Sequence, residues 1–259
     1  MKIFKLKSEL VLYLNHLRNS KSIGFVPTMG SLHKGHLSLI EFAKFNCDIV
    51  VCSIFVNPTQ FDDSDDFHNY PRDIKDDILL LQNINCDILY CPHESDLYFE
   101  NQDVEYFNFN DLDKYMEGAQ RRGHFNGVAT IIKKMFEVVS PEKAFFGQKD
   151  LQQLQIIKHI TNQLQLNVEI IGLPTVREAS GLAMSSRNKK LSKSDFKKST
   201  LIYESLMYAK ENFTHMSVNE LKIRIVSRFN NQSDLELEYL EIVDLKTLTP
   251  ITKFLAKDK

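Results

Sequence analysis

Short apolar runs alternate with longer amphipathic segments along the first part of the chain. These runs, each bounded by Gly, Pro, Asn, Asp or Lys, predict strands at residues 22–26, 49–56, 88–91, 143–146 and 168–173. Apolar residues at spacings of three and four predict helices at residues 37–45, 74–82, 128–139 and 151–164. Strands that alternate with helices are typical of crossover units. We therefore expect an α/β fold: a doubly wound, Rossmann-like parallel sheet with helices on both faces.

The pattern changes after Pro174. A polar stretch at residues 177–194 is followed by two helical segments and by a strand predicted at residues 237–244. We therefore expect a larger domain over residues 1–174 and a smaller α+β domain over residues 175–259. Two packed domains leave a cleft between them, which is a common place for a ligand to bind.

Composition narrows the possible partners. Of 259 residues, 43% are hydrophobic, and 32 Lys and Arg residues face 34 Asp and Glu residues, which gives a net charge of −2. This balance provides no general attraction to nucleic acid or to an anionic membrane surface. No apolar run approaches the roughly 20 residues that span a bilayer. We expect a soluble, cytoplasmic protein without nucleic-acid or membrane partners.

The four cysteines form two pairs with equal spacing, Cys47 with Cys52 and Cys86 with Cys91. This spacing matches no common zinc pattern. Cys52 and Cys91 also lie in or at the end of apolar strand segments, so we interpret the cysteines as buried thiols on neighbouring strands.

The clearest candidate chemistry follows the first predicted strand, in the segment PTMGSLHKGH at residues 27–36. Free N–H groups at a helix start, beside the carboxyl end of a parallel strand, attract phosphate. His33 and His36 are three residues apart and share one helix face, and Gly35 leaves room for a close ligand. A bare His-x-x-His pair could also be a helix cap or part of a metal site. The segment lacks the GK[ST] and G-x-G-x-x-G nucleotide motifs.

The whole segment resembles the His-x-Gly-His signature of the nucleotidylyltransferase superfamily, which cleaves ATP between the α and β phosphates. Further motifs appear in the order found in the pantothenate synthetase family: FVNPTQF at 55–61, YPR at 70–72, HFNGV at 124–128, FGQKD at 146–150 and MSSR at 184–187. The resemblance implies an ATP-dependent ligase. Pantoate would form pantoyl adenylate and pyrophosphate, and β-alanine would then displace AMP to give pantothenate.

The resemblance also implies a site. His36, His33 and Lys149 are the expected catalytic residues. The expected ATP contacts are Met29, Gly30, Ser31, Leu32, His33, Lys34, Gly35, His36, Gly147, Gln148, Lys149, Asp150, Val176, Met184, Ser185, Ser186 and Arg187. The expected contacts with pantoate and β-alanine are Met29, Asn57, Gln60, Arg121, His124 and Gln153.

The chemistry of these residue types agrees with the implied roles. His36 would donate a hydrogen bond or a proton to the departing pyrophosphate, and the amide of Gln60 can both donate and accept. Lys149 precedes a helix, where a cation opposes the helix dipole unless an anion lies between them. The hydroxyls and guanidinium at residues 185–187 can hold phosphate oxygens, and the smaller domain that carries them would close as a lid.

Other expectations concern metal, assembly and surface. The resemblance places Asp76 and Asp77 near magnesium, although ATP normally brings that ion with most of its waters. It also implies a homodimer. The acidic run at residues 62–66 is interpreted as a solvated loop. The chain ends at Lys259, earlier than the resemblance leads us to expect, so we expect the smaller domain to lack its final strand.

Three alternatives remain open. A nucleotidylyltransferase acting on a phosphate ester would share His33 and His36 but would need a basic cluster at Gln60 and Gln153. An aminoacyl-tRNA synthetase would need a tRNA-binding extension and a more positive surface. A non-catalytic ATP-binding protein would bind the nucleotide without turnover.

Overall fold

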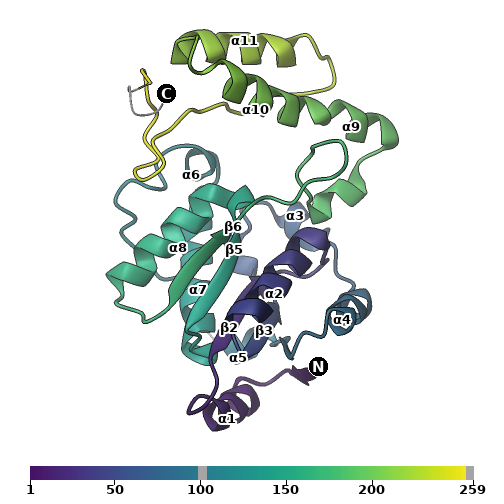
Figure 1. Cartoon of the computed structure of the whole chain (residues 1–259), viewed down its shortest axis with the longest axis vertical. Coiled ribbons are helices and arrows are strands. Elements are labelled where there is room, and N and C mark those ends of the chain that lie inside the picture. Colours follow the sequence, from purple (N-terminus) through teal and green to yellow (C-terminus); the bar gives the residue numbers. More distant parts are fainter. Residues whose placement is uncertain (99–103, 255–259) are drawn as a thin grey trace.

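A six-stranded parallel sheet forms the centre of the protein in a computed structural model that describes residues 1–98 and 104–254 (Figure 1). The strand order is β1-β4-β3-β2-β5-β6, and all pairings are parallel. The strands are β1 (Lys2–Phe4), β2 (Ile23–Thr28), β3 (Ile49–Ile54), β4 (Ile88–Tyr90), β5 (Lys143–Gly147) and β6 (Glu169–Leu173). The order reverses beside β2, as expected for a doubly wound fold, so the predicted fold class is confirmed.

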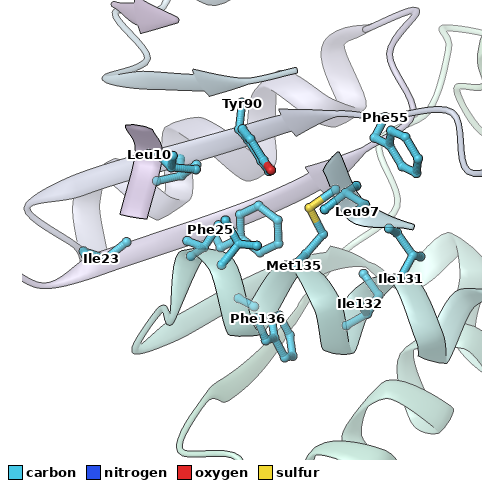
Figure 2. Packing of buried hydrophobic residues seen from close by; sticks show 14 of the residues in the cluster. Leu10, Ile23, Phe25, Phe55, Tyr90, Leu97, Ile131, Ile132, Met135 and Phe136 are labelled. Carbon is cyan, nitrogen blue, oxygen red and sulfur yellow. The ribbon is translucent and has the colours of Figure 1, made fainter. Parts of the chain in front are cut away.

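Two groups of helices cover the sheet because each buries an apolar stripe. On one face, α2 (Lys34–Asn46) and α4 (Ile74–Asn83) pack on Val26, Val50 and Leu89. On the other face lie α1 (Lys7–Leu17), α7 (His124–Val139) and α8 (Leu151–Gln163). Figure 2 shows this second core, where Phe25 on β2 meets Met135 and Phe136 on α7.

Shorter helices connect these elements near the ends of the strands. They are η1 (Pro58–Gln60), α3 (Ser64–His68), α5 (Glu94–Leu97), α6 (Glu117–Gln120) and η2 (Gln148–Asp150). The chain after β6 forms η3 (Ser186–Lys190), α9 (Lys193–Lys198), α10 (Thr200–Asn212) and α11 (Val218–Asn230). In Figure 1 the pair α10 and α11 lies above the sheet, beyond the end where β5 and β6 finish.

The final described segment returns to the first part of the chain. Leu248 is fully buried in a third apolar cluster with Phe109 and Phe125, and Val243 packs against the same cluster. The helices α9 to α11 are therefore connected to the sheet region at both ends, by the chain after β6 and by this packed segment.

The structure differs from the predicted elements at residues 237–244 and at the amino terminus. The predicted strand at 237–244 is wrong: Val243 forms one isolated bridge with Pro250, and no strand lies beside this segment among residues 104–254. Apolar residues alone do not make a strand, because its backbone N–H and C=O groups need partners on a neighbouring chain segment. The amino-terminal β1 and α1 were not predicted, because the many charged residues there obscured the buried Leu10 and Leu14.

All four cysteines are free; Cys47, Cys52 and Cys86 are buried and Cys91 is half-buried. This agrees with their interpretation as thiols packed at the strands. Within the described residues, the helices are too short or too polar to cross a bilayer.

Candidate active site

The loop between β2 and α2 places both histidines at the carboxyl end of a central strand. His33 is the N-cap of α2, and its Nδ1 accepts a hydrogen bond from the backbone N–H of Gly35 at 3.1 Å. The backbone N–H of His33 in turn donates to Nδ1 of His36 at 3.3 Å. The two side chains thus form a reciprocal capping box, a role that Ser or Thr and Glu usually fill.

These bonds determine which nitrogen of each ring carries a proton. Because both Nδ1 atoms accept, the neutral rings have their protons on Nε2. The rings stack, with centroids 4.0 Å apart and planes at 29°. Burial, the nearby His33 ring and Lys149 lower the pKa of His36 to about 3, and burial with Lys149 and Lys189 lowers the pKa of His33. Both rings are therefore neutral N–H donors near neutral pH.

Cations and a segment from the later part of the chain surround this pair. Lys149 follows β5 in η2, where its Nζ lies 3.1 Å from Asp150. A Cβ atom placed on Gly35 would lie 2.9 Å from Cε1 of His33 and 3.9 Å from Cβ of Met184. Glycine is thus required for the His33 ring to lie where it does, and Met184 lies near the first turn of α2.

The expected substrate residues form a second group at η1. The side-chain amide of Gln60 donates to Sδ of Met29 at 2.9 Å and accepts from Asn57 at 3.2 Å. Asn57 is buried, and its oxygen accepts from Tyr98 at 2.8 Å. Gln60 thereby connects η1 to the β2–α2 loop, and the buried side chain of Asn57 connects η1 to Tyr98.

The backbone oxygen of Gln60 is held by two further expected residues. His124 donates from Nδ1 at 2.7 Å, and Arg121 donates at 3.3 Å while pairing with Asp62 at 3.2 Å. Burial and the charge of Arg121 lower the pKa of His124. A cavity of about 170 Å³ lies beside Gln60 and His124, and another of about 230 Å³ is lined by Met29.

Arg187 is paired in a way that the sequence did not suggest. Its guanidinium donates to both carboxylate oxygens of Asp66, at 2.6 and 3.4 Å, and lies over the ring of Tyr70 at 5.5 Å. Tyr70 also reaches the hydroxyl of Ser186 at 3.3 Å. The acidic run at 62–66 is therefore more than a solvated loop, because Asp62 and Asp66 hold two arginines of the site.

Other expected contacts occupy less constrained positions. Val176 accepts from the backbone N–H of Met184 at 3.0 Å, and Ser185 caps η3. Among the described residues, no hydrogen bond engages the half-buried side chain of Gln153. The remaining expected residues lie at the ends of β2 and β5 and the first turns after them: Ser31, Leu32, Lys34, Gly147, Gln148 and Asp150.

Asp76 and Asp77 do not fit a magnesium site. Asp77 is buried, and its two oxygens accept the backbone N–H groups of Ser31 and Leu32 at 2.8 and 2.7 Å. Asp76 is exposed on α4. In the part of the chain that the structure describes, no three His, Cys, Asp or Glu side chains converge on a possible metal position. No chemical step is therefore assigned to a protein-bound metal.

Comparison with known sequences identifies the family. A family model described as pantoate-beta-alanine ligase matches residues 2–258. A pantothenate synthetase from Christiangramia forsetii is 46% identical over 255 residues, covering 98% of this chain and 90% of the relative. Another, from Fervidobacterium nodosum, is 45% identical over 243 residues and covers 93% and 86%.

Solved structures agree. Pantothenate synthetase from Thermus thermophilus has a TM-score of 0.93 and 39% identity, covering 99% of this chain and 92% of that one. Pantoate-beta-alanine ligase from Francisella tularensis, complexed with beta-gamma ATP and beta-alanine, has a TM-score of 0.80 and 37% identity, covering 88% and 86%. With the same family found in sequence and in fold over nearly its whole length, this chain belongs to the pantoate–β-alanine ligase family.

Proposed function

We propose that this ligase joins pantoate to β-alanine through a pantoyl-adenylate intermediate. A pantoate carboxylate oxygen would attack the α-phosphorus of ATP, and the bond from that phosphorus to the β-phosphate oxygen would break to release pyrophosphate. The amine of β-alanine would then attack the acyl carbon and expel AMP, losing a proton. The Francisella tularensis relative, complexed with beta-gamma ATP and beta-alanine, supports two of these three substrates.

The stacked pair of His33 and His36 carries the proposal. Negative charge grows on the phosphate oxygens as pyrophosphate leaves, so fixed donors at that position stabilise the transition state. Both Nδ1 atoms already accept backbone hydrogen bonds, and no hydrogen bond within residues 1–98 and 104–254 engages either Nε2–H group. With a pKa of about 3, His36 would act as a neutral hydrogen-bond donor, not as an imidazolium acid. Lys149 would add a positive charge beside them.

The carboxylate and amine substrates would bind on the side of Gln60. Its amide is oriented by Met29 and Asn57 and has hydrogen-bonding capacity left for a hydroxyl or a carboxylate. Gln153 would be the second pantoate contact, and Arg121 with His124 would border the pocket that receives β-alanine. The cavity beside Gln60 and His124 supports this placement.

Residues 175–259 are proposed to act as a lid over the nucleotide, beside the larger unit of residues 1–174. Ser185, Ser186 and Arg187 would hold triphosphate oxygens from this side. The position of Met184 supports this proposal, because a Cβ atom placed on Gly35, between the two histidines, would lie 3.9 Å from Cβ of Met184. Because Leu248 is packed in the core under α7 and α8, the mobile portion would be α9 to α11, tethered at both ends. Closure would exclude water from the adenylate.

Assembly and surroundings complete the proposal. We propose a cytoplasmic homodimer that has small-molecule substrates and no nucleic-acid or membrane partner. The resemblance to the family supports the dimer. The net charge of −2 supports the lack of nucleic-acid and membrane partners, because it provides no general attraction to either. Magnesium would enter bound to the triphosphate of ATP, without Asp76 or Asp77 as ligands.

An isotope experiment tests the intermediate. Pantoate labelled with ¹⁸O in its carboxylate would be incubated with ATP, β-alanine and enzyme. Attack on the α-phosphorus leaves one labelled oxygen in AMP, which mass spectrometry detects. Unlabelled AMP formed together with pantothenate would exclude the adenylate route.

A further inference from the structure

Asp77 lies on the buried face of α4 and contacts the histidine-bearing loop. It is 2% exposed, and each of its two carboxylate oxygens accepts one backbone N–H, from Ser31 and from Leu32. The preceding N–H, of Gly30, donates to Oγ1 of Thr28 at 3.2 Å. Three successive backbone donors of the loop are therefore satisfied by two side chains.

The loop needs this support because its backbone is strained. Gly30 has φ of +84° and Ser31 has φ of +49°. Glycine adopts the left-handed region readily, but a serine there is unfavourable unless its surroundings hold it in place. Directly after these two residues the chain reaches Leu32 and then His33, the N-cap of α2. A change of conformation at Ser31 would move the point from which both imidazole rings project.

We propose that Asp77 is a positioning residue, which fixes the loop at 30–32 so that the Nε2–H groups of His33 and His36 converge on the phosphate. The carboxylate acts through the protein backbone and not through a metal, because it is 2% exposed and each of its oxygens is directed at a backbone N–H donor. The expected effect of Asp77 on the rate of ligation rests on the proposed function. Its expected effect on the conformation of the loop is independent of that function.

The test compares Asp77→Asn with Asp76→Asn. The two residues are neighbours on α4, but Asp76 is exposed, and among the described residues no hydrogen bond or ion pair joins its side chain to the loop. The Asp77→Asn change keeps the size of the side chain but leaves only one acceptor. Two quantities are measured: hydrogen-exchange protection of the Ser31 and Leu32 amides by NMR, and kcat/KM for ATP over a range of magnesium concentrations.

Asp77→Asn should reduce protection of these two amides and lower kcat/KM roughly 10- to 100-fold, as expected for a displacement of about 1 Å at a catalytic group. High magnesium should not restore the rate, and Asp76→Asn should behave like the wild type. Recovery at high magnesium would overturn the proposal in favour of a metal ligand. Unchanged amide protection would also overturn it. If the wild type has no ligase activity, the proposed function fails, and the exchange data alone still decide whether Asp77 holds the loop.

A second variant covers the case in which Asp77→Asn does not fold. Asp77→Glu retains the charge but moves the oxygens by one methylene. The proposal predicts a folded protein with lowered kcat/KM at every magnesium concentration. Wild-type kcat/KM in Asp77→Glu would show that the position of the carboxylate does not matter, and would contradict the proposal.

Discussion

His33 and His36 stack with their ring centroids 4.0 Å apart while each Nδ1 accepts a backbone N–H at the start of α2. One nitrogen of each ring therefore serves the fold and the other remains for a ligand. Because the two ring nitrogens have different partners, each histidine can cap the helix through Nδ1 and donate a hydrogen bond to phosphate through Nε2–H. It also allows the two roles to be separated by mutation.

Replacing His36 by Asn or by Gln should separate capping from catalysis. The oxygen of Asn can take the place of Nδ1 and preserve the cap, but it provides no donor at the position of Nε2. The amide of Gln reaches the Nε2 position. We expect kcat for His36→Asn to fall by roughly 100- to 1,000-fold, as when one oxyanion donor is lost, with a smaller loss for His36→Gln. Steady-state kinetics and thermal unfolding check this. Equal kcat values in the two variants would argue against an Nε2 donor.

Stability should depend on pH through His36. Its pKa is about 3 in the folded protein and about 6.5 in an unfolded chain, so between these values the unfolded chain binds more protons. Stability from this group is complete above pH 6.5 and declines as the pH falls toward 3. At pH 5 the penalty would reach up to about 2 kcal/mol. His36→Asn should therefore lose less stability between pH 7 and pH 5 than the wild type in urea titrations; identical losses would show that His36 is not buried as a neutral ring.

Removing the carboxylate of Asp66, which pairs with Arg187, should strengthen the binding of ATP. Its hydrogen bond lowers the pKa of Asp66, so this carboxylate is ionised and competes with phosphate for the guanidinium. A partly exposed ion pair is worth roughly 0.2 to 1 kcal/mol, so Asp66→Asn should lower KM for ATP by up to about fivefold. Asp65→Asn, at an exposed position on the same short helix, is the control. A raised KM in Asp66→Asn alone would mean that Asp66 orients Arg187 for ATP and does not compete with it.

The packed carboxy-terminal segment should contribute strongly to stability. Leu248 is fully buried beside Phe109 and Phe125, whereas Leu245 is 60% exposed in the same segment. Leu248→Ala should reduce the free energy of unfolding by about 2 to 5 kcal/mol. Leu245→Ala should change it by less than about 0.5 kcal/mol. Denaturant unfolding measures both changes. Equal losses of unfolding free energy in the two variants would contradict the packing of Leu248 that tethers the lid.

The sequence predicted the sheet well because its central strands are continuous apolar runs. Parallel strands buried on both faces need such runs, and the segment at 49–56 is a clear example. The edge strand β1 has only three residues, two of them exposed, so no apolar run marks it. The predicted strand at 237–244 is wrong for another reason: a strand needs a neighbouring segment to pair its backbone, and here only Val243 and Pro250 form a bridge.

The site was predictable where motifs are contiguous and unpredictable where contacts are long-range. Nothing near Asp66 in the sequence points to Arg187, because the two come together only when the chain after β6 folds back. Asp77 did carry a usable signal. It lies four residues before the buried Leu81, on the apolar stripe of α4, where an unpaired carboxylate would be costly. A carboxylate at such a position requires buried donors, and the loop at residues 30–32 provides them.

Exchange of labelled pyrophosphate into ATP tests the central claim most directly. The enzyme is incubated with ATP and labelled pyrophosphate in the absence of β-alanine, with and without pantoate. We predict that label enters ATP only when pantoate is present, because the adenylate forms reversibly before the amine is needed. Exchange without pantoate, or no exchange with pantoate while ATP still binds, would contradict the account.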